Sequence, residues 1–318
     1  MTYPLPIPWP PTSARKKRWL IGVSGGLDSM ALMHLLKDAG FRNVIVCHLD
    51  HGIRGKESAA DARFVNRWAM KLGYAFESAQ INLRNIIAEK GLSLETSGRN
   101  SRHQYFASCA KSKRCKRLFL AHHLDDQAET VLWNLMRGSH GCRGMREVSE
   151  MEMDGTQMEV HRPLLGIRKS ELRAWMENRK LPWREDASNQ VNDVTRNRIR
   201  NDALPLLADI ARRDVAPLLS RAAQADQAMR EVLNWALKKA EVLDPQGRLH
   251  LGVLRELPEA LRIHAISYFL KSNGIPDISG ALLESCAVML DPTSSASVNL
   301  PGGARLRRRA GRFFVESC

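Results

Sequence analysis

A glycine-rich turn between an apolar run and a helical segment constrains this chain more than any other feature. The apolar run WLIGVS covers residues 19–24, the turn SGGLDS covers 24–29, and helical spacing of apolar residues continues over Met30–Ala39. Apolar runs alternate with helix-length segments in the same way up to about Leu207. This alternation predicts an α/β fold with a doubly wound, mostly parallel sheet, because strands separated by helices are joined by crossover connections.

The other elements of this part are expected from periodicity and from glycine positions. The expected strands are 43–49, 74–81 and 118–123, and the expected helices are 57–72, 99–110 and 125–136. The glycine-rich stretch 138–144 is expected to be a loop.

The pattern changes after Pro205, where long helical segments replace the alternation. Helices are expected at 214–241, 257–273 and 278–290, and the end of the chain alternates around glycines as a small hairpin would. We therefore expect a proline-rich N-terminal arm at 1–17, an α/β domain at 18–214 and a smaller, mainly helical domain at 215–318.

Composition limits the cellular setting and the partner. No run of about 18 apolar residues is present, so no membrane span is expected, and the N-terminus lacks the pattern of a secretory signal. The six cysteines form no C-x-x-C pair, which is typical of reduced thiols in a cytoplasmic protein. A net charge of +14 favours a polyanionic partner.

The glycine-rich turn has the chemistry of a phosphate site. It lies where a strand passes into a helix, the edge at which doubly wound sheets bind ligands. Its glycines allow a tight turn, the helix start offers free N–H groups, and Asp28 is placed to hold Mg²⁺ among phosphates. The predicted ATP-binding residues are Ser24, Gly25, Gly26, Leu27, Asp28 and Ser29. A structural turn capped by serine or aspartate is the alternative.

A second cluster, AHHLDDQAET at residues 121–130, joins the end of a strand to the start of a helix. Asp126 and Glu129 are three residues apart and share a helical face directed at the same sheet edge as the turn. Helix capping by Asp125 and a transition-metal site built on His122 and His123 both remain open.

Two further segments carry polar groups that suit a nucleotide or RNA. His48, Asp50 and His51 lie at the end of the second strand and just after it, where the base or ribose commonly lies in such folds. Arg196 and Arg200 are i,i+4 neighbours on one helical face, whereas Arg198 points elsewhere. An ordinary polar loop and a solvated helix face are the alternatives for these two segments.

Taken together, these segments resemble one family of enzymes, the tRNA(Ile)-lysidine synthetases. The matching pieces are SGGLDS, HLDHGIR (48–54), AHHLDDQAET, HRPLL (161–165), and EDASN with RNRIRNDALP (185–205), in family order. SGGxDS after a strand is the signature of the wider PP-loop family, the N-type ATP pyrophosphatases. The resemblance implies a short member without the extra C-terminal domain of longer ones. Gly98-Arg99 and His103-Gln104 depart from the commoner Ala-Arg and Arg-Tyr.

The resemblance implies ATP and Mg²⁺ as substrate and cofactor. The family transfers lysine to C2 of the wobble cytidine in a tRNA(Ile) with a CAU anticodon, through an adenylated tRNA intermediate. Asp28 and Asp126 would then share the Mg²⁺, and Asp28, Asp126 and Arg196 would be catalytic. Asp126, Glu129 and Arg196 would bind free lysine, and the nucleotide pocket would include His48, Asp50, His51, His122 and His123.

The tRNA partner is expected to contact basic clusters. Residues 99–117 hold seven Lys or Arg and no acidic residue. The predicted contacts are Arg99, Arg102, Arg198, Arg200, Arg307, Arg308 and Arg309. The oligomeric state, a homodimer included, is left open by the sequence.

Three alternative functions remain open. A tRNA thiolase of the PP-loop family would need cysteines arranged to carry sulfur. A metal-dependent phosphoesterase would use Asp50-His51 and His122-His123 to hold a transition metal. A basic RNA-binding protein without catalysis would leave the glycine-rich turn unexplained.

Overall fold

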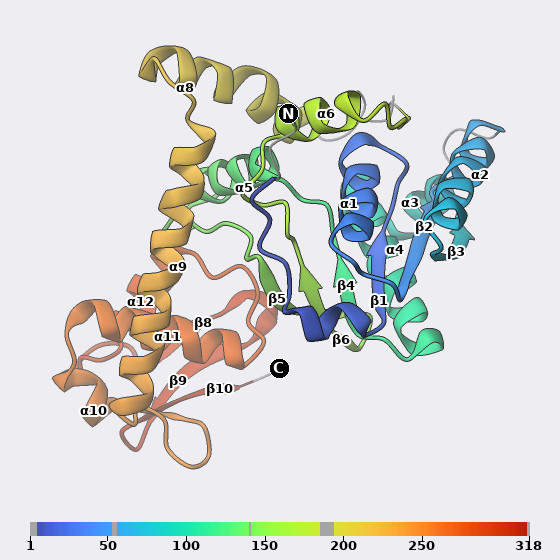
Figure 1. Cartoon of the computed structure of the whole chain (residues 1–318). Coiled ribbons are helices and arrows are strands. Elements are labelled where there is room, and N and C mark those ends of the chain that lie inside the picture. Colours follow the sequence, from blue (N-terminus) through green and yellow to red (C-terminus); the bar gives the residue numbers. More distant parts are fainter. Residues whose placement is uncertain (1–4, 53–55, 140, 185–193, 317–318) are drawn as a thin grey trace. The chain divides into compact units, whose positions relative to one another are not determined.

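The computed structural model describes residues 5–52, 56–139, 141–184 and 194–316 (Figure 1). The chain divides into two compact units. The first comprises Met1–Thr130 and Met145–Ser220, and the second comprises Val131–Gly144 and Arg221–Cys318. Among the described residues, no helix is both long and apolar enough to cross a membrane.

The first unit is built on a six-stranded sheet with the order β3-β2-β1-β4-β6-β5 (Figure 1). The strands are β1 (Trp19–Gly22), β2 (Val44–Asp50), β3 (Ala75–Gln80), β4 (Arg117–Phe119), β5 (Val148–Met153) and β6 (Thr156–His161). All neighbouring pairs are parallel except β5 and β6, which form an antiparallel hairpin. This confirms the expected α/β fold with a mostly parallel sheet.

Helices cover both faces of this sheet. They are α1 (Leu27–Asp38), α2 (Lys56–Lys71), α3 (Leu83–Lys90), α4 (Leu94–Lys113), α5 (Leu124–Met136) and α6 (Lys169–Asn178). Side chains alternate across each strand, so Trp19 and Ile21 pack with α1 and α6, whereas Leu20 packs with α4. The near-continuous apolar runs of β1 and β2 follow from this, because both faces of the strands are buried.

The N-terminal segment packs on the first unit. Leu5, Ile7 and Trp9 lie against the core on the α1 side of the sheet, and the Trp9 ring lies 5.7 Å from that of Phe41. A 3₁₀ turn, η1 (Thr12–Lys16), then leads into β1. The described part of the proline-rich arm is therefore attached to the core through its apolar side chains.

After α6, the chain continues through three helical segments. These are α7 (Val194–Arg198), a π-helical turn η3 (Ile199–Ala203) and α8 (Leu204–Ala211). Leu206 and Ile210 of α8 are 59% and 69% exposed. The EDASN segment lies within 185–193, outside the described residues.

The second unit combines helices with a four-stranded antiparallel sheet in the order β7-β10-β9-β8. Its helices are the greater part of α9 (Ala216–Lys239), α10 (Leu251–Glu256), α11 (Glu259–Ser272) and α12 (Gly280–Val288). Its strands are β7 (Leu249–His250), β8 (Ser297–Asn299), β9 (Arg305–Arg309) and β10 (Arg312–Glu316), with a short 3₁₀ turn η4 (Pro301–Gly303) between β8 and β9.

The sequence located the long elements better than the short ones. Helices α9, α11 and α12 end within three residues of the expected bounds, and β9 and β10 form the expected hairpin. The hairpin is part of a larger sheet, because the two-residue and three-residue strands β7 and β8 are too short for periodicity to detect. The strand expected at 118–123 ends earlier, at Phe119, and α4 extends beyond the expected 99–110 at both ends.

Candidate active site

The SGGLDS turn closes on itself through its two serines. Ser29 Oγ accepts the Ser24 N–H at 3.2 Å and donates to Gly26 O at 3.1 Å, and Ser24 Oγ accepts the Gly26 N–H at 3.3 Å. Gly25 has a φ of +99°, a conformation that residues with a Cβ rarely adopt. No side chain caps the start of α1. The turn therefore presents uncapped backbone N–H groups, as an anion site at a helix N-terminus does.

His123 connects this turn to the start of α5. Its Nε2 lies 3.6 Å from Asp28 Oδ2 and 3.5 Å from Asp126 Oδ2, and its Nδ1 lies 3.5 Å from Asp125 Oδ2. Burial alone would lower the pKa of His123, but the three carboxylates raise it to about 9. His123 is therefore a buried cation at neutral pH that holds three aspartates together.

Asp28 has a second cationic neighbour and one unused oxygen. Lys169 Nζ lies 3.4 Å from Asp28 Oδ2, whereas Asp28 Oδ1 is buried without a hydrogen-bond partner. Burial alone would raise the pKa of this carboxyl, but His123 and Lys169 lower it below its ordinary value. An ionised carboxylate with a free buried oxygen beside the SGGLDS turn fits a Mg²⁺ ligand, since Mg²⁺ is bound by one or two carboxylates together with substrate phosphates.

Glu129 is enclosed by two arginines from the segment after α6. Arg196 Nε donates to Glu129 Oε2 at 2.9 Å, and Arg200 Nε donates to Glu129 Oε1 at 2.6 Å. Glu129 is 1% exposed, and burial alone would lower the pKa of Arg200, but Glu129 raises it above its ordinary value. The predicted common face of Arg196 and Arg200 is confirmed by this shared carboxylate.

Asp126 lies between these two groups of charges. Its Oδ2 faces His123, and its Oδ1 lies 3.7 Å from Arg196 Nη2 and 3.5 Å from Arg200 Nη2. These contacts are longer than those of Glu129, so Asp126 has more capacity to accept a donor from a ligand. The structure thus brings together Asp28, Asp126, Glu129 and Arg196, four residues that the sequence placed in one site.

The histidines expected to line the nucleotide pocket differ in their surroundings. His48 is 3% exposed, and its Nδ1 lies 2.8 Å from Val23 O, so it joins the end of β2 to the entry of the phosphate turn. Asp50 accepts the Gly52 N–H at 2.8 Å and shapes its own loop.

Burial lowers the pKa of His122 to about 4, so it is neutral at pH 7, and His122 Nδ1 is buried without a partner. His51 is half-buried, and Ile53 and Arg54 lie outside the described residues.

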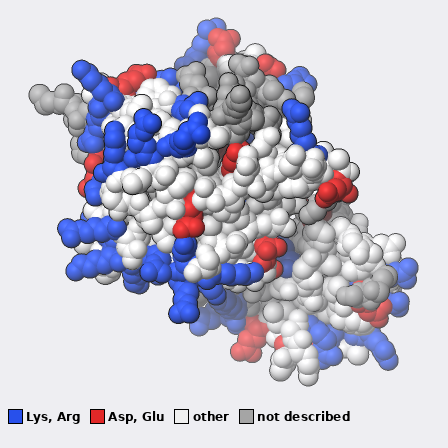
Figure 2. All heavy atoms as spheres, turned by 90° about the vertical axis from the view of Figure 1, so that its right-hand side faces the viewer, with Lys and Arg blue, Asp and Glu red and all other residues white. Residues whose placement is uncertain are grey.

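The arginines expected to contact tRNA differ in their exposure and in their partners. Arg99 and Arg102 are exposed on α4, and Arg198 is exposed beside Asp202, whereas Arg200 lies against Glu129. Figure 2 shows that Lys and Arg side chains form contiguous groups on one face, whereas Asp and Glu side chains are more scattered. The tRNA role of these residues stays a prediction.

In β9 the three consecutive arginines have different environments. Arg307 and Arg309 are exposed, and Arg307 pairs with Glu316 at 2.6 Å. Arg308 points the other way and donates to the carbonyls of Met289, Asp291, Pro292 and Ser294. Arg308 therefore holds the segment after α12, because alternate residues of a strand face opposite sides.

Sequence reasoning missed the start of α6. The Lys169 N–H donates to Asp125 Oδ2 at 2.9 Å, and Arg168 pairs with both Asp125 and, at 3.3 Å, Asp214. Burial alone would raise the pKa of Asp125, but His123, Lys169 and Arg168 lower it to about 2. A signal was available, since two adjacent cations at a helix N-terminus oppose the helix dipole and need compensation.

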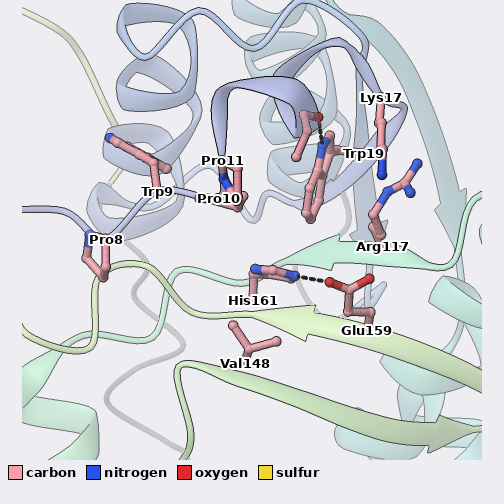
Figure 3. Close-up of a pocket in the computed structure, with 11 residues that line it drawn as sticks. Pro8, Trp9, Pro10, Pro11, Lys17, Trp19, Arg117, Val148, Glu159 and His161 are labelled. Atoms are coloured by element: carbon pink, nitrogen blue, oxygen red, sulfur yellow. Dashed lines mark hydrogen bonds and ion pairs between the residues drawn. The ribbon is translucent and has the colours of Figure 1, made fainter.

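A separate pocket lies beside the N-terminal segment, at the beginnings of β1 and β4 (Figure 3). Its volume is about 290 Å³, and its lining includes Trp9, Trp19, Arg117 and His161. Three of these side chains already have hydrogen-bond partners. Trp19 Nε1 donates to Ala14 O at 2.8 Å, His161 Nε2 lies 2.6 Å from Glu159 Oε1, and Arg117 donates to Arg18 O. None of the predicted site residues lies here, and we assign this pocket no ligand.

Family models match two regions of the chain. Residues 9–207 match the family described as the PP-loop domain, and residues 249–314 match the TilS substrate binding domain.

Several curated proteins named tRNA(Ile)-lysidine synthase are similar to this chain. That of Solibacter usitatus is 38% identical over 219 residues, which cover 69% of this chain and 47% of the relative. That of Thermus thermophilus is 35% identical over 309 residues, which cover 95% and 57%. That of Chlorobaculum tepidum is 30% identical over 295 residues, which cover 90% and 86%. The chain thus spans about half the length of the first two relatives and most of the third.

A solved structure has a similar fold. The U34-tRNA thiolase NcsA from Methanococcus maripaludis, solved with its [4Fe-4S] cluster, aligns with a TM-score of 0.53 and 18% identity, covering 65% of this chain and 71% of that one. At this identity the likeness extends to the fold alone.

Proposed function

Because the chain belongs to the tRNA(Ile)-lysidine synthase family, we propose that it joins lysine to C2 of the wobble cytidine in a tRNA(Ile) with a CAU anticodon, at the expense of ATP. The observation that carries this proposal is the convergence of Asp28, Asp126 and Glu129 with Arg196 next to the phosphate turn. Such a site offers a phosphate cradle and an amine-binding site side by side.

The first step activates the cytidine. Its C2 oxygen attacks the α-phosphorus of ATP, the bond from that phosphorus to the bridging oxygen breaks, and pyrophosphate leaves with the electron pair. The uncapped N–H groups at Leu27–Ser29 and the hydroxyls of Ser24 and Ser29 would hold the phosphates. Asp28, together with Asp126, would hold the Mg²⁺, which supplies Lewis-acid stabilisation of the phosphate charge.

The second step transfers lysine. Its neutral amine nitrogen forms a bond to C2, the bond from C2 to the phosphorylated oxygen breaks, AMP leaves, and the proton lost from the nitrogen goes to water. Asp126 is the candidate partner of the amine, because its contacts with the arginines are longer than those of Glu129. Arg196, which is 39% exposed, would bind the carboxylate of lysine, and Glu129 would hold Arg196 in place.

The tRNA would be bound through its backbone and read at an unstacked anticodon base. Arg99 and Arg102 on α4, with Arg307 and Arg309 on β9, are the candidate backbone contacts because their side chains are exposed. We also propose, from the sequence alone, a cytoplasmic location and a homodimer. The reduced cysteines fit the cytoplasm.

The thiolase alternative has little support in the arrangement of cysteines. Cys47, Cys109, Cys115 and Cys286 are buried in the described part of the chain, and Cys142 is half-buried. A cysteine that carries sulfur must be accessible to its substrate. The phosphoesterase alternative needs a cluster of metal ligands, and no group of three or more His, Cys, Asp or Glu side chains suited to a metal occurs within the described residues.

The deciding experiment is the incorporation of labelled lysine into unmodified tRNA(Ile) bearing CAU, with and without ATP. The proposal predicts ATP-dependent labelling with one AMP per lysine, lost in Asp28→Ala. Pyrophosphate release that tRNA stimulates, without labelling, would leave a PP-loop enzyme that uses another nucleophile. The absence of both signals would contradict the proposed function.

A further inference from the structure

Lys169 begins α6 with its side chain against the phosphate turn. Its ammonium lies 3.4 Å from Asp28 Oδ2, and its side chain is 36% exposed. A lysine at the first position of a helix opposes the helix dipole, which disfavours cations at this end. Its position therefore needs an anionic partner, and Asp28 is that partner in this structure.

The backbone at Lys169 is held firmly from a second direction. Asp125 accepts the Lys169 N–H at 2.9 Å and pairs with Arg168, the residue before it. Asp125 itself lies 3.5 Å from His123 Nδ1. The starts of α1, α5 and α6 are thus joined through Asp28, His123 and Asp125, and these contacts place the backbone of Lys169 beside the turn.

The two oxygens of Asp28 face different groups, Oδ2 facing Lys169 and Oδ1 having no partner. Asp28 Oδ1 is buried without a partner and suits Mg²⁺, whose charge would offset that of the carboxylate and weaken its attraction for the ammonium. Lys169 would then have a phosphate on the turn as its nearest available anion. An ammonium is a compact point charge that binds phosphate oxygens in this manner.

We infer that Lys169 binds the β- and γ-phosphates of ATP and stabilises the departing pyrophosphate. This inference deepens the proposed function and rests on it. When the cytidine oxygen bonds to the α-phosphorus, the electron pair of the broken bond goes to the former bridging oxygen of pyrophosphate, which gains one negative charge. The positive charge of the Lys169 ammonium stabilises this negative charge electrostatically, and no proton is transferred.

Binding of inorganic pyrophosphate and of AMP, each measured by calorimetry in the presence of Mg²⁺, tests this inference without tRNA or lysine. Lys169→Met is expected to weaken pyrophosphate binding by about tenfold to a hundredfold, the range of a charge-assisted contact. AMP binding is expected to change less than about twofold, since AMP lacks the β- and γ-phosphates. Lys169→Arg is expected to restore most of the pyrophosphate affinity, because it keeps the charge.

The exposed Lys111 on α4 offers a matched control, and Lys111→Met is expected to leave both affinities unchanged. Equal weakening of AMP and pyrophosphate would overturn the inference, as it would indicate general damage to the site. If Lys169 only positioned Asp28, the Lys169→Met variant would recover its full pyrophosphate affinity at a raised Mg²⁺ concentration. That result would also overturn the inference. Lysine transfer is not part of either measurement, so a failure of the proposed function would be seen separately.

Discussion

Arg200 Nε lies 2.6 Å from Glu129 Oε1, so a residue of the π-helical turn η3 neutralises a carboxylate that is 1% exposed on α5. The two residues are 71 positions apart in the chain. Because Arg196 binds the same carboxylate, Glu129 holds two residues of the segment after α6 at the site.

Replacing that carboxylate should cost both stability and activity. Glu129→Ala leaves two guanidinium groups without their partner, and we expect the free energy of unfolding to fall by roughly 3 kcal/mol. Chemical denaturation would measure this, with Glu150→Gln on the exposed side of β5 as a control expected to change it by less than about 0.5 kcal/mol. An unchanged stability of Glu129→Ala would mean that the two arginines find other partners.

The phosphate turn should be sensitive to a side chain at Gly25. Gly25 has a φ of +99°, and an added Cβ would lie 3.3 Å from Val65 Cγ2. We expect Gly25→Ala to lower stability by about 1 kcal/mol and to abolish measurable ATP binding, because the backbone must distort at the anion site.

Gly40 provides the matched control, since its φ is +85° and an added Cβ meets nothing within 4 Å. Gly40→Ala should lose a similar stability of about 1 kcal/mol while binding ATP normally. If both variants bound ATP equally well, the turn would not be the phosphate site.

The pKa of His123 predicts an alkaline loss of stability. In the folded protein this pKa is about 9, raised from its ordinary 6.5. Because the folded value is the higher one, the stabilisation is complete below about pH 6.5 and is lost as the pH rises toward about 9. Denaturation of metal-free protein across this range would show the decline, and His123→Gln should remove it. If the wild type and His123→Gln lost the same stability over this range, the decline would come from other titrating groups.

An acid loss of stability is expected from Asp125. Its pKa falls from 3.8 to about 2, so its contribution is complete above about pH 4 and disappears as the pH drops toward 2. In Asp125→Asn this part of the acid transition should be smaller. A transition of unchanged size would show that Asp125 contributes little to the folded state.

Replacing Arg308 and replacing Arg309 on β9 should have different effects, the first on stability and the second on tRNA binding. Arg308→Met removes donors to four carbonyls and is expected to destabilise the second unit by about 2 kcal/mol or more. Arg309→Gln should leave the free energy of unfolding unchanged and weaken tRNA binding. The slope of log tRNA affinity against log salt concentration should fall by an amount equal to about one phosphate contact. A tRNA affinity in Arg309→Gln that equals the wild type at all salt concentrations would remove this strand from the interface.

Local sequence was sufficient for the parts of the site that lie within single segments. The turn Ser24–Ser29 follows from two glycines after a buried strand, and the shared face of Asp126 and Glu129 follows from helical spacing. The parallel direction of the first strands was also predicted, because strands that alternate with helices are joined by crossover connections.

What the sequence could not reveal were the contacts between segments. The ion pairs of Lys169 with Asp28 and of Arg168 with Asp125 join residues that are far apart in the chain, and no local pattern specifies such a pairing. The same holds for Arg308, whose neighbours in sequence are exposed while it holds a loop. Charge, periodicity and turn chemistry are properties of adjacent residues, and they determined the fold class and the SGGLDS turn. The partner of each buried charge depends on which strands and helices meet at one sheet edge, and only the tertiary structure decides that.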